Sequence, residues 1–316
     1  MLSSIYTTWR DRGTATLLQA IGNQLVAGVH SKILRRRFLE KQIHDYRLLI
    51  DLQDRGISRG LLLFGTREVD HKILLEQIAR PGMMVFDIGA NIGYYALMEL
   101  GLIGPTGRML AIEPSPSNIA LLKRNLELNS EGERITVLEG AVSDKPGTAS
   151  FHLSAHSNLG TFHASGSAEK LLSGEQISVR TYTVPELAAE HGAPDLIRMD
   201  VEGHEVEVIR GMIPAIREAA MKPTIIFETH LSRYSEDHDM AGVLRELFDC
   251  GYGVPRAASS WQEGTKRIEA LGYKGSDPIP TDGVERVIFE NISNEHALEC
   301  ICRTGGLRTV VLAPVD

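Results

Sequence analysis

The sequence has little cysteine, no long apolar run and no surplus of positive charge. Its three cysteines, Cys250, Cys300 and Cys302, are too few and too clustered for a disulfide framework, and they lack the paired spacing of a zinc site. No apolar stretch approaches the roughly 20 residues that a membrane-spanning helix requires. A formal net charge of -8 provides no general attraction to nucleic acid or to an anionic lipid surface. These absences predict a soluble protein with reduced thiols and without a nucleic-acid partner.

The N-terminal part of the chain is rich in apolar residues at helical spacing. Arg10 and Asp11 stand where a secretory peptide would need its apolar run, so we expect no export and a cytoplasmic location. The spacing between residues 14 and 55 predicts two or three helices. The run Arg35-Arg36-Arg37, near Lys32 and Lys41, fits a solvated helix face better than a patch for an anionic membrane or a polyanionic substrate. Residues 1–65 are therefore assigned to an N-terminal helical extension.

From residue 66 onward the pattern predicts one large α/β domain, 66–316. An amphipathic helix over 66–80 comes first, and short apolar runs then alternate with amphipathic segments, as in strands that crossover helices bury on both faces. Because crossovers are right-handed, we expect a doubly wound, mostly parallel sheet with an antiparallel C-terminal strand. The expected strands are 83–88, 108–113, 134–139, 195–200 and 223–229, with an antiparallel edge pair at 251–256 and 308–313; the expected helices lie near 92–103, 117–129, 183–191, 204–219 and 239–250.

Two stretches interrupt this rhythm, residues 144–181 and residues 257–307. The first contains two short candidate strands, 148–153 and 176–181, and the second is a long excursion that includes Trp261. In a doubly wound fold such insertions gather beside the carboxyl ends of the strands, where ligands bind. We therefore expect both to form walls or lids of a substrate pocket, although their aromatic residues would also suit a core.

A glycine turn follows the first expected strand and precedes a helix. Its spacing, from Gly89 through Asn91 to Gly93, differs from the Gly-x-Gly-x-x-Gly pattern that places a diphosphate on a helix N-terminus. Asp87 precedes the turn, where a carboxylate would repel phosphate and suit a cationic group such as a sulfonium-bearing amino acid. Glu113 ends the second strand, the place where an acidic side chain accepts both ribose hydroxyls of a nucleoside.

These segments resemble the FkbM family of S-adenosylmethionine-dependent methyltransferases. The resemblance covers roughly residues 66–230 and rests on VFDIGANIGYYA, AIEPSPSNIALLKRN, EGAVSD, DLIRMDVEGHEVEVIRG and TIIFETH, in that order. It implies a class I, Rossmann-like methyltransferase fold and S-adenosylmethionine as the cofactor. By position in the motif, the residues expected to contact this cofactor are Asp87, Gly89, Asn91, Gly93 and Glu113.

The adenine contact departs from the wider methyltransferase pattern. Many such enzymes place an acidic residue next to glycine after the third strand, whereas Gly140 here is followed by Ala141. The backbone, Ser143 or Asp144 is therefore expected to supply the contact.

Acidic and histidine residues end the fourth and fifth expected strands, beside the cofactor turn. Asp200 is the first choice for the reaction centre, either as the base that removes the acceptor proton or as a ligand to the cofactor's ammonium group. His204 and His230 are alternative bases, with Glu228 in the same pocket. Glu202 is expected to cap the following helix. This group also has the oxygen and nitrogen donors of a divalent metal site, although we expect no metal.

The resemblance implies O-methylation of a hydroxyl group on a sugar, a glycan or a secondary metabolite, by in-line displacement. A nicotinamide-dependent oxidoreductase on the same sheet is an alternative, opposed by the missing diphosphate motif and by Asp87. A nucleoside-binding regulator without catalysis is a second alternative. No sequence feature identifies the acceptor or the oligomeric state.

Overall fold

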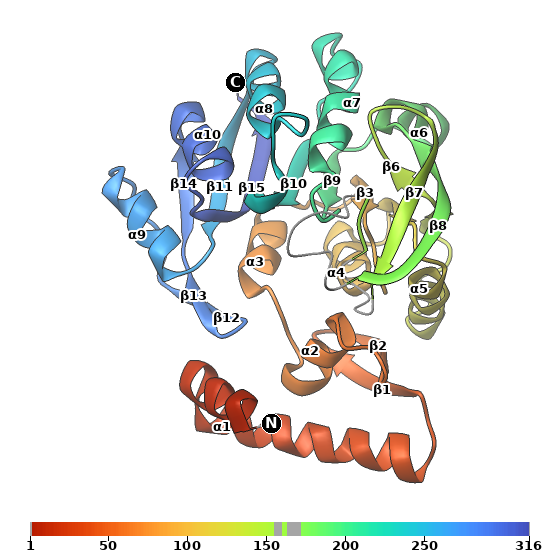
Figure 1. Ribbon diagram of the computed structural model, residues 1–316. Helices are drawn as coiled ribbons and strands as arrows, with labels where there is room; N and C mark the ends of the chain where they lie inside the picture. The colour runs from red at the N-terminus through yellow and green to blue at the C-terminus, as the bar shows by residue number, and fades with distance from the viewer. Residues whose placement is uncertain (1, 155–159, 163–171, 316) are drawn as a thin grey trace.

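A doubly wound sheet forms the centre of the chain (Figure 1). The computed structural model describes residues 2–154, 160–162 and 172–315. Eight strands hydrogen-bond in the order β14-β11-β15-β10-β9-β3-β4-β5, and the five from β10 to β5 are parallel. The strands are β3 (Met84–Ile88), β4 (Arg108–Glu113), β5 (Ile135–Glu139), β9 (Leu196–Met199), β10 (Thr224–Glu228), β11 (Tyr252–Ser259), β14 (Ile288–Ile292) and β15 (Leu307–Pro314). The expected α/β class I methyltransferase fold is confirmed.

The antiparallel part of the sheet differs from the expectation in one respect. The C-terminal strand β15 is antiparallel, as predicted, but it lies between β10 and β11 and is not at an edge. The edge strand is β14, which pairs antiparallel with β11 and comes from the excursion 257–307. In β14 the exposed polar pair Glu290 and Asn291 interrupts the apolar run by which the buried strands were recognised.

Helices cover both faces of the sheet, and alternate residues of each strand pack into separate cores. Phe86 and Ile88 of β3 belong to one core with α6, α7, α8 and α10, whereas Val85 belongs to the other with α3, α4 and α5. This alternation explains why the strands read as continuous apolar runs. The helices are α3 (Val69–Ile78), α4 (Tyr94–Ile103), α5 (Pro116–Leu128), α6 (Val184–His191), α7 (Glu205–Arg217), the 3-10 turn η3 (Leu231–Arg233), α8 (Met240–Asp249), α9 (Gln262–Ala270) and α10 (Asn294–Cys302).

The N-terminal residues contain two helices and a hairpin. Helix α1 (Leu2–Gly28), kinked at Gly13, continues into a π-helical turn, η1 (Val29–Ile33), and α2 (Ile57–Phe64) follows later. Between them, β1 (Phe38–Ile43) and β2 (Tyr46–Asp51) form an antiparallel hairpin, so the prediction of helix over this part was wrong. Buried residues alternate along β2, and their spacing satisfies a strand as well as a helix. Arg35–Arg37 were predicted to lie on a helix face, but residues 35–37 lie between η1 and β1 and belong to no helix.

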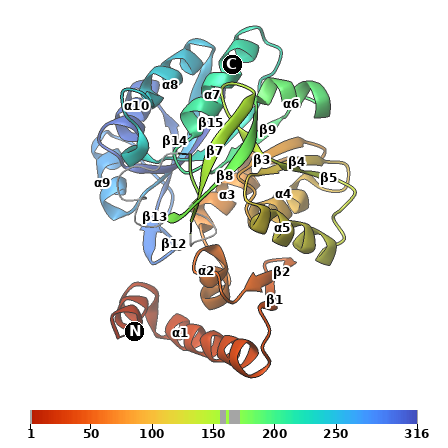
Figure 2. The same ribbon diagram turned by 45° about the vertical axis from the view of Figure 1, so that its right-hand side comes forward.

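The two insertions add small sheets. Residues 141–182 form a three-stranded sheet in the order β6-β8-β7, which includes both predicted strands. Its strands are β6 (Ala141–Val142), β7 (Gly147–Ser154) and β8 (Leu172–Tyr182); a second hairpin consists of β12 (Ile279–Thr281) and β13 (Val284–Arg286). Figure 2 shows β7 and β8 lying in front of the central sheet. Among the described residues, no helix is long and apolar enough to cross a membrane.

Candidate cofactor-binding and active site

A pocket of about 270 Å³ lies at the carboxyl ends of β3, β4, β5 and β9. This is the edge at which a doubly wound sheet binds its ligands. The insertion 144–181 supplies one wall, as expected, whereas none of the described lining residues comes from 257–307, contrary to the expectation. The lining residues that matter below are Ile57, Glu68, Gly89, Asn91, Glu113, Phe151, Ser154, Phe162, Ser173, Glu175, Arg198, Asp200, Glu202 and His204.

The turn after β3 brings backbone close to the end of β9. Gly89 has a φ of +83°, and a Cβ there would stand 2.3 Å from the carbonyl oxygen of Asp200. Only glycine therefore permits this approach. Gly93, at a φ of +92°, begins α4 and faces Leu122; it does not line the pocket. Gly89 and Asn91 do line it.

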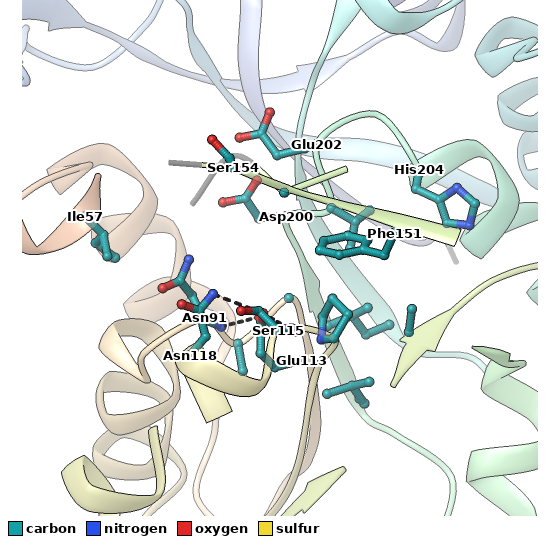
Figure 3. Close-up of a pocket in the computed structure, with 18 of the residues that line it drawn as sticks. Ile57, Asn91, Glu113, Ser115, Asn118, Phe151, Ser154, Asp200, Glu202 and His204 are labelled. Atoms are coloured by element: carbon teal, nitrogen blue, oxygen red, sulfur yellow. Dashed lines mark hydrogen bonds between the residues drawn. The ribbon is translucent and has the colours of Figure 1, made fainter. Parts of the chain in front are cut away.

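Glu113 ends β4 with its carboxylate held by three donors (Figure 3). Its Oε2 accepts from the Asn91 backbone N–H at 2.9 Å; its Oε1 accepts from the Ser115 N–H at 3.0 Å and from Asn118 Nδ2 at 3.1 Å. Burial raises the pKa of Glu113 to about 7, although these donors act in the opposite direction. A carboxylate has about four lone-pair positions, so capacity to accept from a ligand hydroxyl remains.

A buried arginine connects two of the predicted site residues. Arg198 Nη1 lies 3.2 Å from Asp87 Oδ1, and Arg198 Nη2 lies 3.2 Å from Asp200 Oδ2. The guanidinium also donates to the Gly89 carbonyl at 3.2 Å and sits 4.1 Å from the centroid of the Tyr95 ring. Asp87 is fully buried, does not line the pocket and contacts Arg198. No sequence motif pointed to Arg198, although a charge within the apolar strand Leu196–Met199 is an available signal.

Asp200 and Glu202 stand at the opposite end of the pocket from Glu113 (Figure 3). Asp200 Oδ1 is buried and has no hydrogen-bond partner among the residues that the structure describes. Glu202 has a φ of +52°, and the helix α7 begins without a side-chain cap, so the expectation that Glu202 caps it was wrong. Burial raises the pKa of Glu202 to about 7, against the effect of the nearby His230. The carboxylates of Asp200 and Glu202 therefore belong to the same wall of the pocket.

His230 lies behind Glu202 and is held between carboxylates. Its Nδ1 lies 2.9 Å from Oε1 of the buried Glu205, and its Nε2 lies 3.6 Å from Glu202 Oε2. Burial lowers the pKa of His230, but the two carboxylates outweigh burial and raise it to about 10. An imidazolium at this position is not a base at neutral pH, and His230 does not line the pocket.

His204 lines the pocket, but both of its ring nitrogens are engaged. Nε2 lies 3.0 Å from Ser143 Oγ, and Nδ1 lies 3.3 Å from Glu207 Oε2. The ring lies against Phe162, with centroids 4.6 Å apart. Neither Ser143 nor Asp144 lines the pocket, whereas Gly140, Ala141 and Val142 do.

Glu228 belongs to a second buried ion network behind the pocket. It pairs with Arg308, whose Nη2 also lies 3.3 Å from Glu68 Oε1. Burial raises the pKa of Glu228 to about 8 despite this arginine. Tyr95 Oη donates to Glu68 Oε2 at 2.6 Å, so this network supports the pocket floor that Glu68 and Tyr95 line. Glu228 itself does not reach the cavity.

Asp200, Glu202 and His230 form a group, here called the carboxylate–histidine cluster, that has the donors of a metal site. One ligand-type atom from each lies within 4.8 Å of the others. Carboxylate oxygen with imidazole nitrogen suits several divalent metals. The imidazolium form of His230, however, already places a cation beside Glu202. A divalent metal ion and the imidazolium of His230 are thus alternative sources of positive charge in this cluster. Only the metal ion would make turnover sensitive to the removal of divalent ions.

Comparison with known families finds one match that covers more than half of the chain. The model of the methyltransferase FkbM domain matches residues 87–254. This range includes the glycine turn, Glu113, the insertion 144–181 and the carboxylate–histidine cluster.

Two of the curated relatives are named as methyltransferases of small molecules or sugars. The chain is 30% identical over 162 residues to the hexuronic acid methyltransferase AglP of Haloferax volcanii, a match that spans 50% of this chain and 60% of AglP. It is 28% identical over 199 residues to the 31-O-demethyl-FK506 methyltransferase FkbM of Streptomyces tacrolimicus, across 53% of this chain and 70% of that protein. A crystal structure of an FkbM methyltransferase from Methylobacillus flagellatus superposes with a TM-score of 0.36 at 14% identity, across 89% of this chain and 60% of the other.

Proposed function

The chain belongs to the FkbM methyltransferase family, and from this premise we propose that it methylates a hydroxyl group of a sugar, glycan or secondary metabolite with S-adenosylmethionine. One observation carries the proposal. One pocket has Glu113, a hydrogen-bond acceptor suited to a nucleoside hydroxyl, at one end and the carboxylates of Asp200 and Glu202 at the other (Figure 3). The turn lacks the diphosphate-binding motif that a nicotinamide-dependent enzyme would need. Residues 66–316 would form the catalytic domain.

The pocket residues fit S-adenosylmethionine, which supplies a methyl group bonded to a sulfonium. Glu113 would accept a ribose hydroxyl at its remaining lone-pair position, and Gly89 leaves room for a ligand at the turn. Oδ1 of Asp200, which has no hydrogen-bond partner among the described residues, offers an anionic acceptor to the ammonium group. Asp87 would act through Arg198, by orienting the guanidinium that holds Asp200. The backbone from Gly140 to Val142 is the proposed adenine contact in place of Ser143 or Asp144.

Glu202 is the residue that we assign as general base. Its carboxylate borders the pocket and is not paired with an arginine as Asp200 is. Glu202 would take the proton of the acceptor hydroxyl as its oxygen receives the methyl group, and the electron pair of the broken carbon–sulfur bond would stay with the cofactor's sulfur. A pKa near the working pH is the optimum for this role. His204 would position the Phe162 ring in the pocket wall. His230 and Glu228 would act from outside the cavity, His230 through its contact with Glu202 and Glu228 through its ion pair with Arg308.

The acceptor side of the pocket has a mixed polar and aromatic wall. Ser154, Ser173 and Glu175 come from the insertion and line the pocket together with Phe151 and Phe162. Hydroxyl and carboxylate groups beside aromatic rings suit a polyhydroxylated ring. The names of AglP and of the Streptomyces enzyme, which state a hexuronic acid and 31-O-demethyl-FK506 as their acceptors, support a hydroxylated small molecule or sugar here.

Two measurements test the proposal. Mass spectrometry of the purified protein should find retained S-adenosylhomocysteine, and a screen with a methyl-labelled donor should transfer label to a hydroxylated acceptor. Glu202→Gln should then lower kcat by roughly 10² to 10⁴-fold while cofactor binding stays unchanged. Saturable binding of NADH without binding of S-adenosylmethionine would support the oxidoreductase instead. Cofactor binding with no labelled product from any hydroxylated acceptor would support the non-catalytic regulator.

A further inference from the structure

The exposed apolar side chains of the molecule are concentrated in its N-terminal segment. Outside this segment, the large exposed apolar residues among those described are Trp261, Leu271 and Val315. Monomeric soluble proteins seldom expose a contiguous apolar patch of this kind without a partner. The exposed members within the segment are Tyr6, Trp9, Leu18, Ile21, Leu25, Val26, Val29, Ile33 and Leu34.

Five of these residues form one line along the outer face of α1 and η1. Leu18, Ile21, Leu25, Val29 and Ile33 recur every three or four positions, which places them on one side of a helix, here called the α1 stripe. Leu25 and Ile33 are 67% and 72% exposed, among the highest values of any large apolar side chain described. Figures 1 and 2 show α1 at the base of the molecule, with no other element on its outer side.

The opposite face of α1 is packed against the body of the protein. Ala20 and Ala27 are buried on this face, and Asn23 Nδ2 donates to the Leu63 carbonyl of α2 at 3.0 Å. Near the kink, Arg12 lies 4.0 Å from the centroid of the Phe64 ring. The helix is therefore fixed in place on one side, and its apolar outer side is not needed for that packing.

Positive charge adjoins the α1 stripe. Residues 13–31 contain no Lys, Arg, Asp or Glu, and Lys32, Arg35, Arg36 and Arg37 then follow in close succession. Arg37 pairs with Asp51 at 2.8 Å, but Lys32, Arg35 and Arg36 form no ion pair with any residue that the structure describes. Residues 1–37 carry a formal charge of +5, from six Lys and Arg against Asp11. Because the whole chain carries -8, residues 38–316 carry -13.

We propose that the α1 stripe and its adjoining cations dock the protein on an anionic phospholipid surface. An apolar helix face that enters the acyl boundary, flanked by cations that meet lipid phosphates, is the arrangement of an interfacial helix. A second copy of the chain is a poorer occupant, because a two-fold interface repeats the same patch on both sides. Parallel pairing would bring Lys32 to Arg37 against the same cations of the partner, and antiparallel pairing would bring them against the uncharged residues 13–31, so neither direction offers them a counter-charge.

Docking through α1 also bears on the position of the pocket. Helix α2 packs on α1 and supplies Ile57 to the pocket wall. The docked protein would hold this wall beside the lipid headgroups. Lys32 lies at the end of η1 and Arg35 and Arg36 follow it closely, and this position beside the stripe favours the membrane over a solvated helix face.

Vesicle sedimentation tests the proposal without requiring turnover. The probes are vesicles of phosphatidylcholine alone and of phosphatidylcholine mixed with phosphatidylserine. The wild-type protein should sediment with the anionic vesicles, less so as salt is raised, and only weakly with the neutral ones. Three variants complete the test: Leu18→Ser with Leu25→Ser and Ile33→Ser; Lys32→Gln with Arg35→Gln and Arg36→Gln; and, as a matched control, Lys222→Gln with Arg245→Gln and Lys274→Gln.

The variants separate the docking surface from total charge. Loss of the three cations beside the stripe should weaken partitioning on the order of 100-fold, about fivefold for each, whereas the control loses the same charge from exposed sites elsewhere and should bind as the wild type does. The serine variant should lose binding to both vesicle types. Because all nine positions are exposed, circular dichroism should find each variant folded. Absence of wild-type binding to anionic vesicles, or a dimer that the serine variant converts to monomer, would overturn the proposal.

Discussion

Glu113→Gln tests the cofactor assignment most directly, because it removes a charge and keeps the size of the side chain. The carboxylate would accept a ribose hydroxyl of S-adenosylmethionine, and a hydrogen bond to a charged group contributes about 1.5–3 kcal/mol. Loss of one such interaction should weaken the Kd by about 10- to 150-fold. Isothermal titration calorimetry with S-adenosylmethionine and with S-adenosylhomocysteine, which lacks the sulfonium charge, measures the effect without an acceptor.

The pH dependence of binding provides a second readout of the same substitution. Burial raises the pKa of Glu113 to about 7, so its ionised form increases as pH rises through that value. If only the ionised form binds, wild-type affinity should rise by about tenfold between about pH 6 and pH 8, and the glutamine variant should lose this dependence. For the apo protein the sign is reversed: a raised pKa in the folded state means that stability falls as pH rises from about 4.5 through about 7.

A matched control separates the hydrogen bonds from total charge in the pocket. Glu175→Gln makes the same chemical change at an exposed lining residue of the insertion, and it should leave the affinity for S-adenosylhomocysteine unchanged. In Glu113→Gln the new side-chain amide meets the Asn91 N–H, which should cost about 1–3 kcal/mol of stability and is measured separately by thermal unfolding. Equal affinities and equal pH profiles for wild type and Glu113→Gln would refute the ribose assignment.

Three further predictions concern the turn, the buried arginine and the carboxylate–histidine cluster. Gly89→Ala should lower the free energy of unfolding in urea by about 2–4 kcal/mol through its positive φ and the contact with the Asp200 carbonyl, whereas Gly132→Ala, with no neighbour within 4 Å, should change little. Arg198→Met should cost about 3–5 kcal/mol because it leaves buried carboxylates unpaired, and adding Asp87→Asn should recover part of the loss; equal stability of the single and double variants would contradict the pairing. EDTA should leave turnover unchanged; a loss that Mg²⁺ restores would assign the cluster to a metal ion.

Local signals in the sequence were sufficient for the parallel sheet. The apolar runs of β3, β4, β9 and β10 are predicted because strands buried on both faces have no polar alternation. Glu113 was found because a strand end and a helix N-terminus adjoin it in the chain. Where two periods fit the same apolar positions, as in the hairpin from Phe38 to Asp51, local pattern was insufficient, and pairing between the strands decided the outcome.

The sequence by itself determined the family, the positions of the parallel strands along the chain and the residues at their carboxyl ends. Only the tertiary structure decided which of those residues face the cavity. Asp87 and Asp200 both lie at strand ends, and Arg198 contacts both carboxylates. Asp87 is fully buried in this ion pair, whereas Oδ1 of Asp200 has no partner among the described residues. Glu202 reaches the pocket through a left-handed backbone, whereas Glu228 pairs with Arg308 behind it. The direction of a side chain depends on neighbours distant in sequence, which no local pattern records.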